Sequence, residues 1–516
     1  GRLLAGSEGT LGIVTEATVS LEPVPNETAV VLLTYDDVLT AMEDVAPILD
    51  HEPAAVEVMD DVLLDLARET AEFAPVVDIL PDGTDSTLLV EFYADSVADG
   101  KQQVADLLAD RLPGYEPAVA ASDDGVRTDE PVNATDALEA YDDDRQAKFW
   151  KMRKAGLPIL LSRTGDEKHW PFVEDTAVPA ENLPEYVADI QELFAEYDTF
   201  ASYYAHAGPG VFHIRPLRNL QAEDGAETML EISDAVTDLV IEYGGSVSGE
   251  HGDGRARTTW NRKLYGDELW ESFRQLKRAF DPQWLLNPGN VCGDADPTEH
   301  LRYDADYEFD AGFEPTLNWE NDNGFQGMAE LCHGCAGCEG HQDTTGGVMC
   351  PTYRATEHEE ITSTRGRANM LRRSMSGDLP DDVFDDEFIH EVLDLCIGCK
   401  GCKRDCPSGV DMAKLKTEVK HEYHQREGVP LRDKLFANVE TLYSLGSTFA
   451  PLSNLATKLP GSGLLAEKTL GIARERELPS FSRTSLQQWD RGRRPAVSER
   501  EADRKALLIA DPYTNY

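Results

Sequence analysis

The sequence is short of basic residues and has no long apolar run. Its 516 residues include 47 lysine and arginine residues against 96 aspartate and glutamate residues, for a formal net charge of -49. Nucleic-acid binding needs a basic face, so this charge argues against nucleic acid as a partner. No run of about 18 apolar residues and no secretion signal pattern is seen. We therefore expect a cytoplasmic protein, at most associated peripherally with the inner face of the membrane.

Lysine is absent from the first hundred residues, and acidic residues run along the whole chain. In strong salt a dense carboxylate surface keeps a protein soluble, while screening weakens its self-repulsion. The composition therefore resembles that of proteins from salt-loving archaea. The chain starts within a glycine-rich turn and stops on an apolar run at 506–511, so we expect a piece of a longer protein.

The apolar pattern predicts an α+β fold of several domains, since single cores seldom exceed about 250 to 300 residues. The predicted strands are Ile13–Val19, Ala29–Leu33, Thr87–Phe92 and Ala201–Ala205. The predicted helices are Ser96–Leu112 and Asn182–Tyr197.

Eight of the nine cysteines fall into two short clusters, and only Cys292 stands apart. The triplet Cys332-His-Gly-Cys335-Ala-Gly-Cys338 recurs as Cys396-Ile-Gly-Cys399-Lys-Gly-Cys402, and a Cys-Pro pair follows each, at Cys350 and Cys406. Cysteines at two-residue gaps in a long acidic chain are typical of metal ligation in a reducing compartment, and not of disulfides.

The two triplets predict two 4Fe-4S clusters. A CxxCxxC turn supplies three thiolates to one cubane, and in two-cluster ferredoxins the Cys-Pro cysteine of one motif ligates the other cluster. Eleven residues separate Cys338 from Cys350, which departs from the bacterial spacing and leaves this exchange open. Structural zinc is the alternative, but zinc sites seldom use such triplets. The predicted ligand sets are Cys332, Cys335, Cys338 and Cys406, and Cys396, Cys399, Cys402 and Cys350.

Two further motifs carry imidazoles and a carboxylate. His206-Ala-Gly-Pro-Gly-Val-Phe-His213 places two histidines on either side of a turn, so that a hairpin can bring them to one metal. Glu250 and His251 follow in a glycine-rich loop. Two histidines and a glutamate with an open position make a Lewis-acid site for Zn²⁺ or Mn²⁺. Two histidines seven residues apart are also common as unrelated core or surface residues, so both interpretations stay open.

Parts of the chain resemble the FAD-linked oxidases of the vanillyl-alcohol-oxidase superfamily, such as D-lactate, D-2-hydroxyglutarate and glycolate dehydrogenases. The opening run Gly6-Ser-Glu-Gly-Thr-Leu-Gly12-Ile-Val resembles the last motif of the family's flavin domain. Leu286-Asn-Pro-Gly289 resembles its closing segment beside the flavin ring. The FAD contacts that the resemblance implies are Glu8, Gly9, Gly12, Ile13 and Asn287.

The resemblance also implies roles at the substrate. It places a metal on His206, His213 and Glu250, and it makes His251 the general base. Trp150-Lys-Met-Arg153 matches the segment whose arginine binds the substrate carboxylate. Val173 stands where many members have a substrate lysine, and Arg215 stands where a polar residue is usual. We therefore leave two roles open for Arg215, binding of a second carboxylate or a surface salt bridge.

The cysteine block resembles the iron-sulfur domain of anaerobic glycerol-3-phosphate dehydrogenase and glycolate oxidase subunits. Together the resemblances imply oxidation of a D-2-hydroxyacid (D-lactate, D-2-hydroxyglutarate or glycolate) to the 2-oxoacid. Electrons would pass from FAD through two 4Fe-4S clusters to a quinone, a cytochrome or a ferredoxin-type acceptor. The alternative is an electron-transfer subunit without its own substrate site, in a complex like heterodisulfide reductase or glycerol-3-phosphate dehydrogenase.

These resemblances imply a division of the chain into six parts. Residues 1–24 would end an FAD-binding domain, and 25–293 would be a ferredoxin-like substrate domain. An acidic linker at 294–328 would lead to a mainly helical 4Fe-4S domain at 329–425. A helix and loop extension at 426–505 and the start of a cysteine-rich domain at 506–516 would follow.

Overall fold

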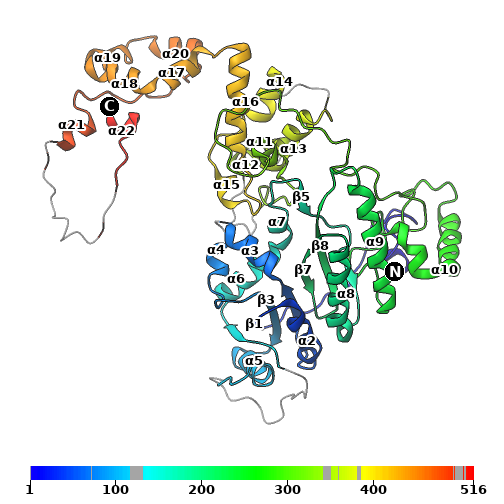
Figure 1. Ribbon diagram of the computed structural model, residues 1–516. Helices are drawn as coiled ribbons and strands as arrows, with labels where there is room; N and C mark the ends of the chain where they lie inside the picture. The colour runs from blue at the N-terminus through cyan, green and yellow to red at the C-terminus, as the bar shows by residue number, and fades with distance from the viewer. Residues whose placement is uncertain are drawn as a thin grey trace. The chain divides into compact units, whose positions relative to one another are not determined.

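The computed structural model describes residues 2–70, 73–116, 132–340, 350–357, 359–379, 385–491, 493, 504 and 507–516. Contacts divide the chain into two compact units, Gly1–Val419 and Lys420–Tyr516. The first unit contains a β-sheet covered by helices and a helical module that carries the cysteine clusters (Figure 1).

An antiparallel sheet organises the first unit. Its strands are β1 (Glu27–Tyr35), β2 (Ala55–Met59), β3 (Ser86–Ala94), β4 (Asp136–Ala140), β5 (Glu167–His169), β6 (Thr176–Ala177), β7 (Ala201–His206) and β8 (Val211–Asn219). The strand order is β4-β1-β3-β2-β7-β8-β5, and β6 pairs with β8. The first four strands and two of their connecting helices form a β-α-β-β-α-β unit, which is the expected ferredoxin-like arrangement.

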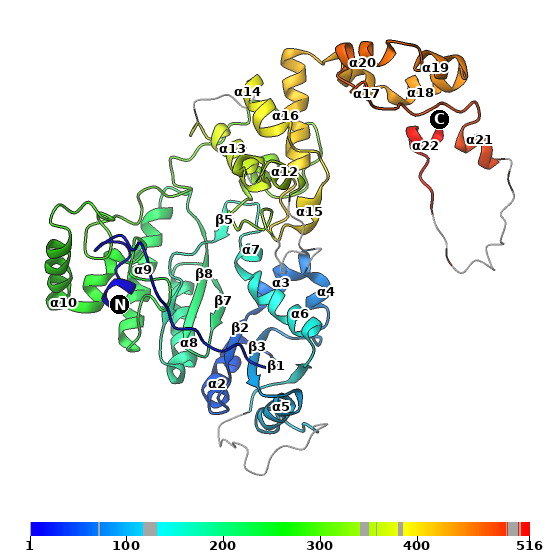
Figure 2. The same cartoon turned by 180° about the vertical axis from the view of Figure 1, so that it is seen from behind.

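Helices cover both faces of the sheet, as the two views show (Figure 1, Figure 2). The apolar core on one face includes α2 (Val38–Leu49), α5 (Val97–Arg111), α8 (Leu183–Glu196) and α9 (Gly225–Glu242). The core on the other face includes α3 (Asp61–Glu69), α4 (Ala74–Val77), α6 (Asp143–Lys154) and α7 (Gly156–Leu160). Because both faces are buried, β1 is apolar without interruption from Ala29 to Leu33: Val31 and Leu33 face the first core, and Val30 and Leu32 the second.

The predicted helices and three of the four predicted strands are confirmed. Helix α5 begins where the Ser96 side chain accepts a hydrogen bond from the backbone N–H three residues further on, and Asp37 and Asp142 do the same for α2 and α6. Helix α8 has no such cap and instead has Pro184 in its first turn. The remaining elements before the cysteines are α1 (Arg2–Ala5), η1 (Ala180–Asn182) and α10 (Thr258–Phe280), which is broken at Gly266.

The strand predicted at Ile13–Val19 is wrong. Residues 12–25 form no helix or strand, and Ile13 and Val19 are 81% and 73% exposed. A strand needs a hydrogen-bonded neighbour, and among the described residues no strand of the sheet pairs with this segment. Alternation of apolar and polar residues was therefore not sufficient to make a strand here.

The cysteine module is mainly helical, as expected. Its elements are α11 (Gly324–Glu330), α12 (Pro351–Ala355), η3 (Glu360–Thr362), α13 (Thr364–Met375), α14 (Asp386–Phe388), the π-helix η4 (Ile389–Leu393), α15 (Gly401–Asp405) and α16 (Met412–Glu427). The module contacts the sheet domain where the Ser408 hydroxyl donates to the carbonyl of Pro158, at 2.9 Å. The acidic segment before α11 is also anchored, because the buried Glu418 accepts hydrogen bonds from the backbone N–H groups of Thr316 and Leu317.

The second unit consists of short helices. These are α17 (Leu431–Ala437), α18 (Val439–Thr448), α19 (Leu452–Ala456), α20 (Ser462–Leu470), α21 (Leu486–Arg491) and α22 (Pro512–Asn515). The apolar run at the end of the chain forms no strand over 507–511, and its first residue, Ala506, lies outside the described residues. Among the helices of the described residues, none has the length and apolar character needed to cross a membrane.

Candidate functional site

The hairpin of β7 and β8 brings the two histidines of the first motif together. His206 ends β7 opposite Val211, and His213 lies on β8 opposite Tyr204. Residues offset by two across an antiparallel pair share a face, so both imidazoles point to the same side. Their ring centroids are 5.2 Å apart.

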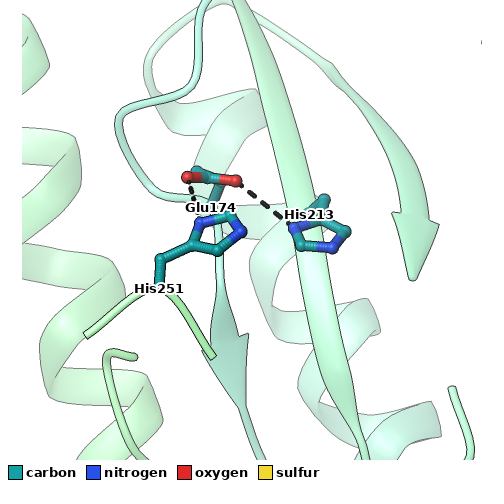
Figure 3. Close-up of side chains that lie close together, drawn as sticks. All are labelled: Glu174, His213 and His251. Carbon is teal, nitrogen blue, oxygen red and sulfur yellow. Dashed lines mark hydrogen bonds and ion pairs between the residues drawn. The ribbon is translucent and has the colours of Figure 1, made fainter. Parts of the chain in front are cut away.

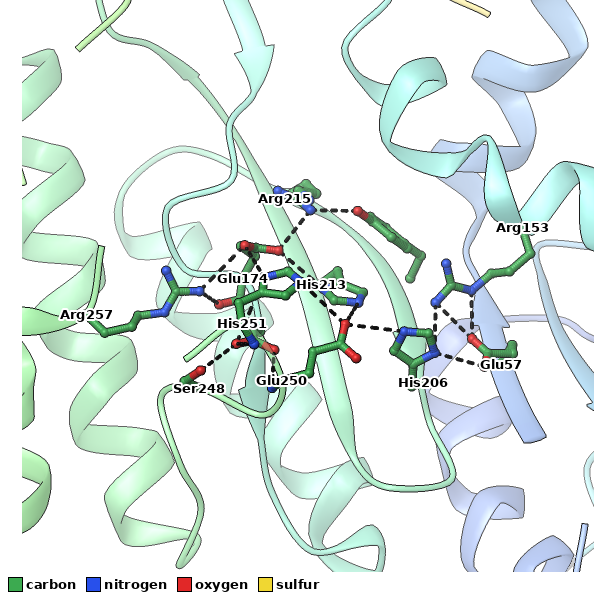
Figure 4. A network of polar contacts seen from close by, with 12 residues as sticks. Glu57, Arg153, Glu174, His206, His213, Arg215, Ser248, Glu250, His251 and Arg257 are labelled. Atoms are coloured by element: carbon green, nitrogen blue, oxygen red, sulfur yellow. Dashed lines mark hydrogen bonds and ion pairs between the residues drawn. The ribbon is translucent and has the colours of Figure 1, made fainter. Parts of the chain in front are cut away.

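One carboxylate oxygen lies among three imidazoles (Figure 4). Glu250 Oε1 is 3.5 Å from His206 Nε2, 3.3 Å from His213 Nε2 and 3.4 Å from His251 Nε2. The set His206, His213 and Glu250 offers three ligand atoms close enough to hold one metal ion. Ligands about 2.0–2.1 Å from a tetrahedral zinc ion lie about 3.4 Å from one another, which is close to these separations.

The other ring nitrogen of each imidazole is held by a second carboxylate. Glu57 Oε1 is 2.9 Å from His206 Nδ1. The two oxygens of Glu174 lie 2.9 Å from His251 Nδ1 and 3.3 Å from His213 Nδ1, so this residue bridges two rings (Figure 3). A proton on each Nδ1 would leave Nε2 with a lone pair, the form that binds a metal or accepts a proton.

Electrostatics reinforce this arrangement. The hydrogen bond to Glu57 raises the pKa of His206 above its usual value, more than burial lowers it. Burial raises the pKa of Glu174, but the hydrogen bond from His213 and the charges of Arg215, His251 and Arg257 outweigh it and lower this pKa to about 2. Glu174 is therefore a permanent anion that fixes the orientation of the rings around it.

Asp175 shapes the loop that carries Glu250 and His251. It is fully buried and has a positive φ of 67°, which is uncommon for a residue with a side chain. Its carboxylate accepts hydrogen bonds from the backbone N–H groups of Glu250 and His251, each at 2.9 Å, and from the hydroxyl of Ser248, at 2.8 Å. This contact sets where the next two side chains point.

Arg153 lies beside this group but already has a carboxylate partner. Its Nε and Nη2 are 2.9 and 2.8 Å from Glu57 Oε2, and Nη2 is 3.5 Å from His206 Nδ1. Within the described residues its Nη1 makes no hydrogen bond. A substrate carboxylate would therefore have to reach the guanidinium from the Nη1 side.

Arg215 is 3% exposed, so a surface salt bridge is wrong for this residue. It lies on β8 with its side chain inside the polar network, where Nη2 donates to Glu174 at 3.0 Å and to the hydroxyl of Tyr204 at 2.6 Å. Among the described residues, its buried Nε and Nη1 have no hydrogen-bond partner. Buried donors without partners carry a cost, so this guanidinium has capacity for a further acceptor.

The residues predicted to contact FAD approach the same loop. Asn287 Nδ2 donates to the carbonyl of Glu8 at 2.5 Å. The Glu8 carboxylate packs on Gly252, where a Cβ atom would lie 1.9 Å from Oε1 and where φ is 87°. Gly9 and Ile13 are exposed, and Gly12 is half-buried. Glu8 thus packs on the residue after His251, and Asn287 contacts Glu8.

The eight clustered cysteines line two cavities. One is lined by the first triplet and Cys406, together with Cys402. The other is lined by the second triplet and Cys350, together with Cys338. The structure therefore groups each fourth cysteine with the opposite triplet.

The surroundings of the thiols fit iron-sulfur clusters. Burial raises the pKa of the Cys332 and Cys402 thiols, each to about 11, so thiolates at these positions need a cation nearby. The buried Arg367 lines the second cavity, and its Nη2 has no partner among the described residues. An anionic cluster in that cavity would balance this charge.

Sequence reasoning missed Glu57, Glu174 and Arg367. Glu57 had a signal, since it is a lone acid between the apolar Val56 and Val58 of a strand. Glu174 directly precedes Asp175 in Phe172-Val-Glu-Asp175, but nothing in the sequence connects it to distant histidines.

Comparison with known families agrees with this fold and site. Residues 24–291 match the model described as FAD linked oxidases, C-terminal domain, and residues 328–410 match the 4Fe-4S dicluster domain. The chain belongs to the FAD-linked oxidase family, and it joins the C-terminal domain of that family to a dicluster module. FAD and 4Fe-4S clusters are the cofactors that go with these two domains.

Some relatives align over the whole of this chain and others over little more than half of it. The chain is 28% identical to a D-2-hydroxyglutarate dehydrogenase of Haemophilus influenzae and 29% identical to one of Escherichia coli, over 100% of this chain and 52% and 53% of theirs. It is 30% identical to the glycolate oxidase subunit GlcD of Escherichia coli over 56% of this chain and 52% of that one. The chain thus spans about half the length of these curated relatives.

Proposed function

We propose that this chain provides the substrate site and the electron-transfer module of an FAD-dependent D-2-hydroxyacid dehydrogenase. The observation that carries the proposal is the convergence of three imidazole Nε2 atoms on Glu250, in the same unit as two cavities lined by cysteines. An electron-transfer subunit without a substrate would have no use for this convergence, which argues against that alternative.

A divalent cation, Zn²⁺ or Mn²⁺, is proposed to bind His206, His213 and Glu250. When bound, it would supply a Lewis acid for the substrate's 2-hydroxyl. The donor set suits it, because the nitrogen and carboxylate oxygen atoms face one point and both imidazoles have carboxylate partners behind them.

His251 is proposed to accept the proton of the 2-hydroxyl at Nε2. Glu174 holds its Nδ1 at 2.9 Å, which favours the tautomer with a free lone pair on Nε2. It also stabilises the imidazolium that forms, as a base in this position requires. Arg153 is proposed to bind the C1 carboxylate through Nη1, since Glu57 engages its Nε and Nη2.

We further propose a substrate with a second carboxylate, such as D-2-hydroxyglutarate, in preference to D-lactate or glycolate. The support is Arg215, whose buried Nε and Nη1 have no partner among the described residues. Because Nη2 already donates to Glu174 and Tyr204, a substrate carboxylate would accept a single charge-assisted hydrogen bond, from Nη1 or from Nε. The D-2-hydroxyglutarate dehydrogenases among the relatives point to the same substrate class.

For the cofactors we propose the route and the contacts that were predicted from the sequence. FAD, when bound, would accept the two electrons of the substrate, and the clusters would carry them singly to a quinone, a cytochrome or a ferredoxin-type acceptor. Association with the inner face of a membrane would suit the first two acceptors.

We propose FAD contacts from Glu8, Gly9, Gly12, Ile13 and Asn287. We propose cluster ligation by Cys332, Cys335, Cys338 and Cys406, and by Cys396, Cys399, Cys402 and Cys350.

A stopped-flow comparison of two variants tests this route in enzyme loaded with FAD and iron. His251→Ala should slow flavin reduction by D-2-hydroxyglutarate by about 10² to 10⁴, the usual contribution of a positioned base. Cys399→Ser should leave flavin reduction nearly unchanged, because that step needs no cluster, and should impair only the onward transfer. Flavin and cluster absorbance are recorded separately.

The exposed His421 on α16 gives a matched control, since His421→Ala removes an imidazole that takes part in none of these contacts. The proposal is wrong if His251→Ala reduces flavin at the rate of the parent enzyme. It is equally wrong if Cys399→Ser, in folded protein with FAD bound, abolishes flavin reduction.

A further inference from the structure

One helix serves both cysteine cavities. On α13, residues four apart lie on one face, and the residue midway between them lies on the other. The backbone N–H of Arg365 is 3.4 Å from Cys338 Sγ, and Asn369 Nδ2 is 4.0 Å from Cys332 Sγ. Arg367, between them, places Nη1 3.6 Å from Cys350 Sγ. The helix therefore meets the two cavities with different chemistry.

The two arginines differ in how their charge is balanced. Arg365 is partly exposed and pairs with two carboxylates, Glu360 at 2.6 Å and Glu339 at 2.9 Å. Arg367 is 1% exposed, and no acidic side chain of the described residues pairs with it. Its Nε donates to the carbonyl of Val392 at 3.0 Å, and its Nη2 has no partner there.

Solvent exposure of the ligands is similar on the two sides. Each ligand set has one exposed cysteine, Cys335 in the first and Cys399 in the second. Among nearby cations, Lys400 pairs with Asp411 at 3.4 Å, and Arg302 donates to the carbonyl of Glu330 without lining the first cavity. Lys416 adds positive charge on the second side, where its Nζ donates to the carbonyl of Cys396 at 2.6 Å, and Arg367 approaches a ligand sulfur itself, at 3.6 Å.

We propose that Arg367 sets unequal potentials for the two clusters, making the cluster of Cys350, Cys396, Cys399 and Cys402 the easier one to reduce. This inference rests on the proposed cluster ligation. Reduction adds one electron to a cluster and breaks no bond, so a fixed positive charge against a ligand sulfur stabilises the reduced form. Net charge and hydrogen bonds to the sulfurs are recognised determinants of such potentials. Arg367 is thus a tuning residue that acts through Cys350.

The test is a redox titration of the complete chain, reconstituted anaerobically and followed by electron paramagnetic resonance. Arg367→Gln should weaken reduction of one cluster by at least about tenfold in the equilibrium constant, which is about 59 mV for one electron. The other step should stay in place. Arg367→Lys keeps the charge and should give a smaller shift. Cys399→Ser changes a ligand of the second cluster, so it should alter the same reduction step that Arg367→Gln shifts and thereby assign that step to this cluster.

Arg354→Gln is the matched control. Arg354 is exposed on α12, four residues from Cys350. Arg354→Gln therefore removes a positive charge that solvent already screens, and the potentials of both clusters should stay unchanged. If Arg367→Gln retains only one cluster, Arg367→Met, which also removes the charge but keeps an unbranched side chain, decides: a downward shift of the Cys399-sensitive step supports the proposal, and an unchanged step overturns it.

The proposal is overturned if both clusters are present and Arg367→Gln moves neither step, moves both equally, or moves the step that Cys399→Ser leaves alone. It is also overturned if the Cys399-sensitive step is the harder to reduce in the parent protein. Zinc in place of iron in the parent protein would instead contradict the proposed function, so the two failures can be told apart by metal analysis.

Discussion

In the sheet domain the buried guanidinium of Arg153 meets the carboxylate of Glu57, whereas in the cysteine module the buried guanidinium of Arg367 meets a thiol and no carboxylate of the described residues. The difference extends to the whole of each site. The imidazoles on the sheet have their orientation fixed by Glu57 and Glu174. The cysteines surround two cavities, and the groups that would bind the thiolates and balance the charge of Arg367 are the iron-sulfur clusters. The sheet site is thus organised by the chain itself, and the module depends on its cofactors.

The largest effect should come from removing the clusters. Metal binding and folding are coupled when the ligands are buried and charged, so the module should lose structure while the sheet keeps it. Amide hydrogen exchange should become at least about 10³-fold faster in α13 and stay unchanged in β1 and β3. Exchange measured on holo-protein and on protein stripped of iron checks this. Equal loss of protection in both regions would contradict the comparison.

A smaller effect should follow from Glu57→Gln, which removes the carboxylate shared by His206 and Arg153. Loss of such a partner typically weakens metal binding by about 10- to 100-fold. Competition of the protein with a chromogenic chelator for Zn²⁺ measures this, and the iron content should not change. Glu91→Gln is the matched control, because Glu91 lies on the neighbouring β3 and bonds Trp150 instead of an imidazole. Equal weakening of Zn²⁺ binding in both variants would show that Glu57 has no specific role in holding His206.

The smallest effect concerns stability at mildly acidic pH. Burial lowers the pKa of His169 on β5 to about 4, against about 6.5 in an unfolded chain. The unfolded state therefore binds the proton first, so this contribution to stability is full above about pH 6.5 and is lost as the pH falls towards 4. The loss should reach about 2 kcal/mol by pH 5.

His169→Gln removes the titration and retains a side chain that can donate to the carbonyl of Arg215, as the ring Nδ1 does at 2.8 Å. Urea unfolding followed by circular dichroism at several pH values should therefore show a shallower decline for this variant. Parallel curves for parent and variant between pH 6.5 and 5 would rule out His169 as the source.

The sequence predicted features whose cause is local or repeated. Strand β1 and helix α8 follow from apolar period, and the cysteine triplets from their spacing. The prediction at Ile13–Val19 failed because pairing depends on a neighbour, which alternation does not reveal. Glu57 and Glu174 were missed because their role depends on contacts with histidines far along the chain. The burial of Arg215 could not be predicted for the same reason, because the spacing of residues in a sequence does not show which face of a strand is covered by distant parts of the chain.

The position of β1 in the sheet has a consequence for how the chain folds. Glu27–Tyr35 precedes both of its partners, β3 and β4, in the chain, and Val30 lies opposite Glu91 of β3 and Ala140 of β4. Folding of non-local antiparallel pairs is slow, because loop closure must precede the contacts that reward it. During synthesis this strand, apolar on both faces, would stay unpaired until β3 leaves the ribosome, and its second edge would stay open until β4 follows. We therefore expect newly made chains to need chaperone protection over this segment, and refolding from denaturant to be limited by aggregation that begins there.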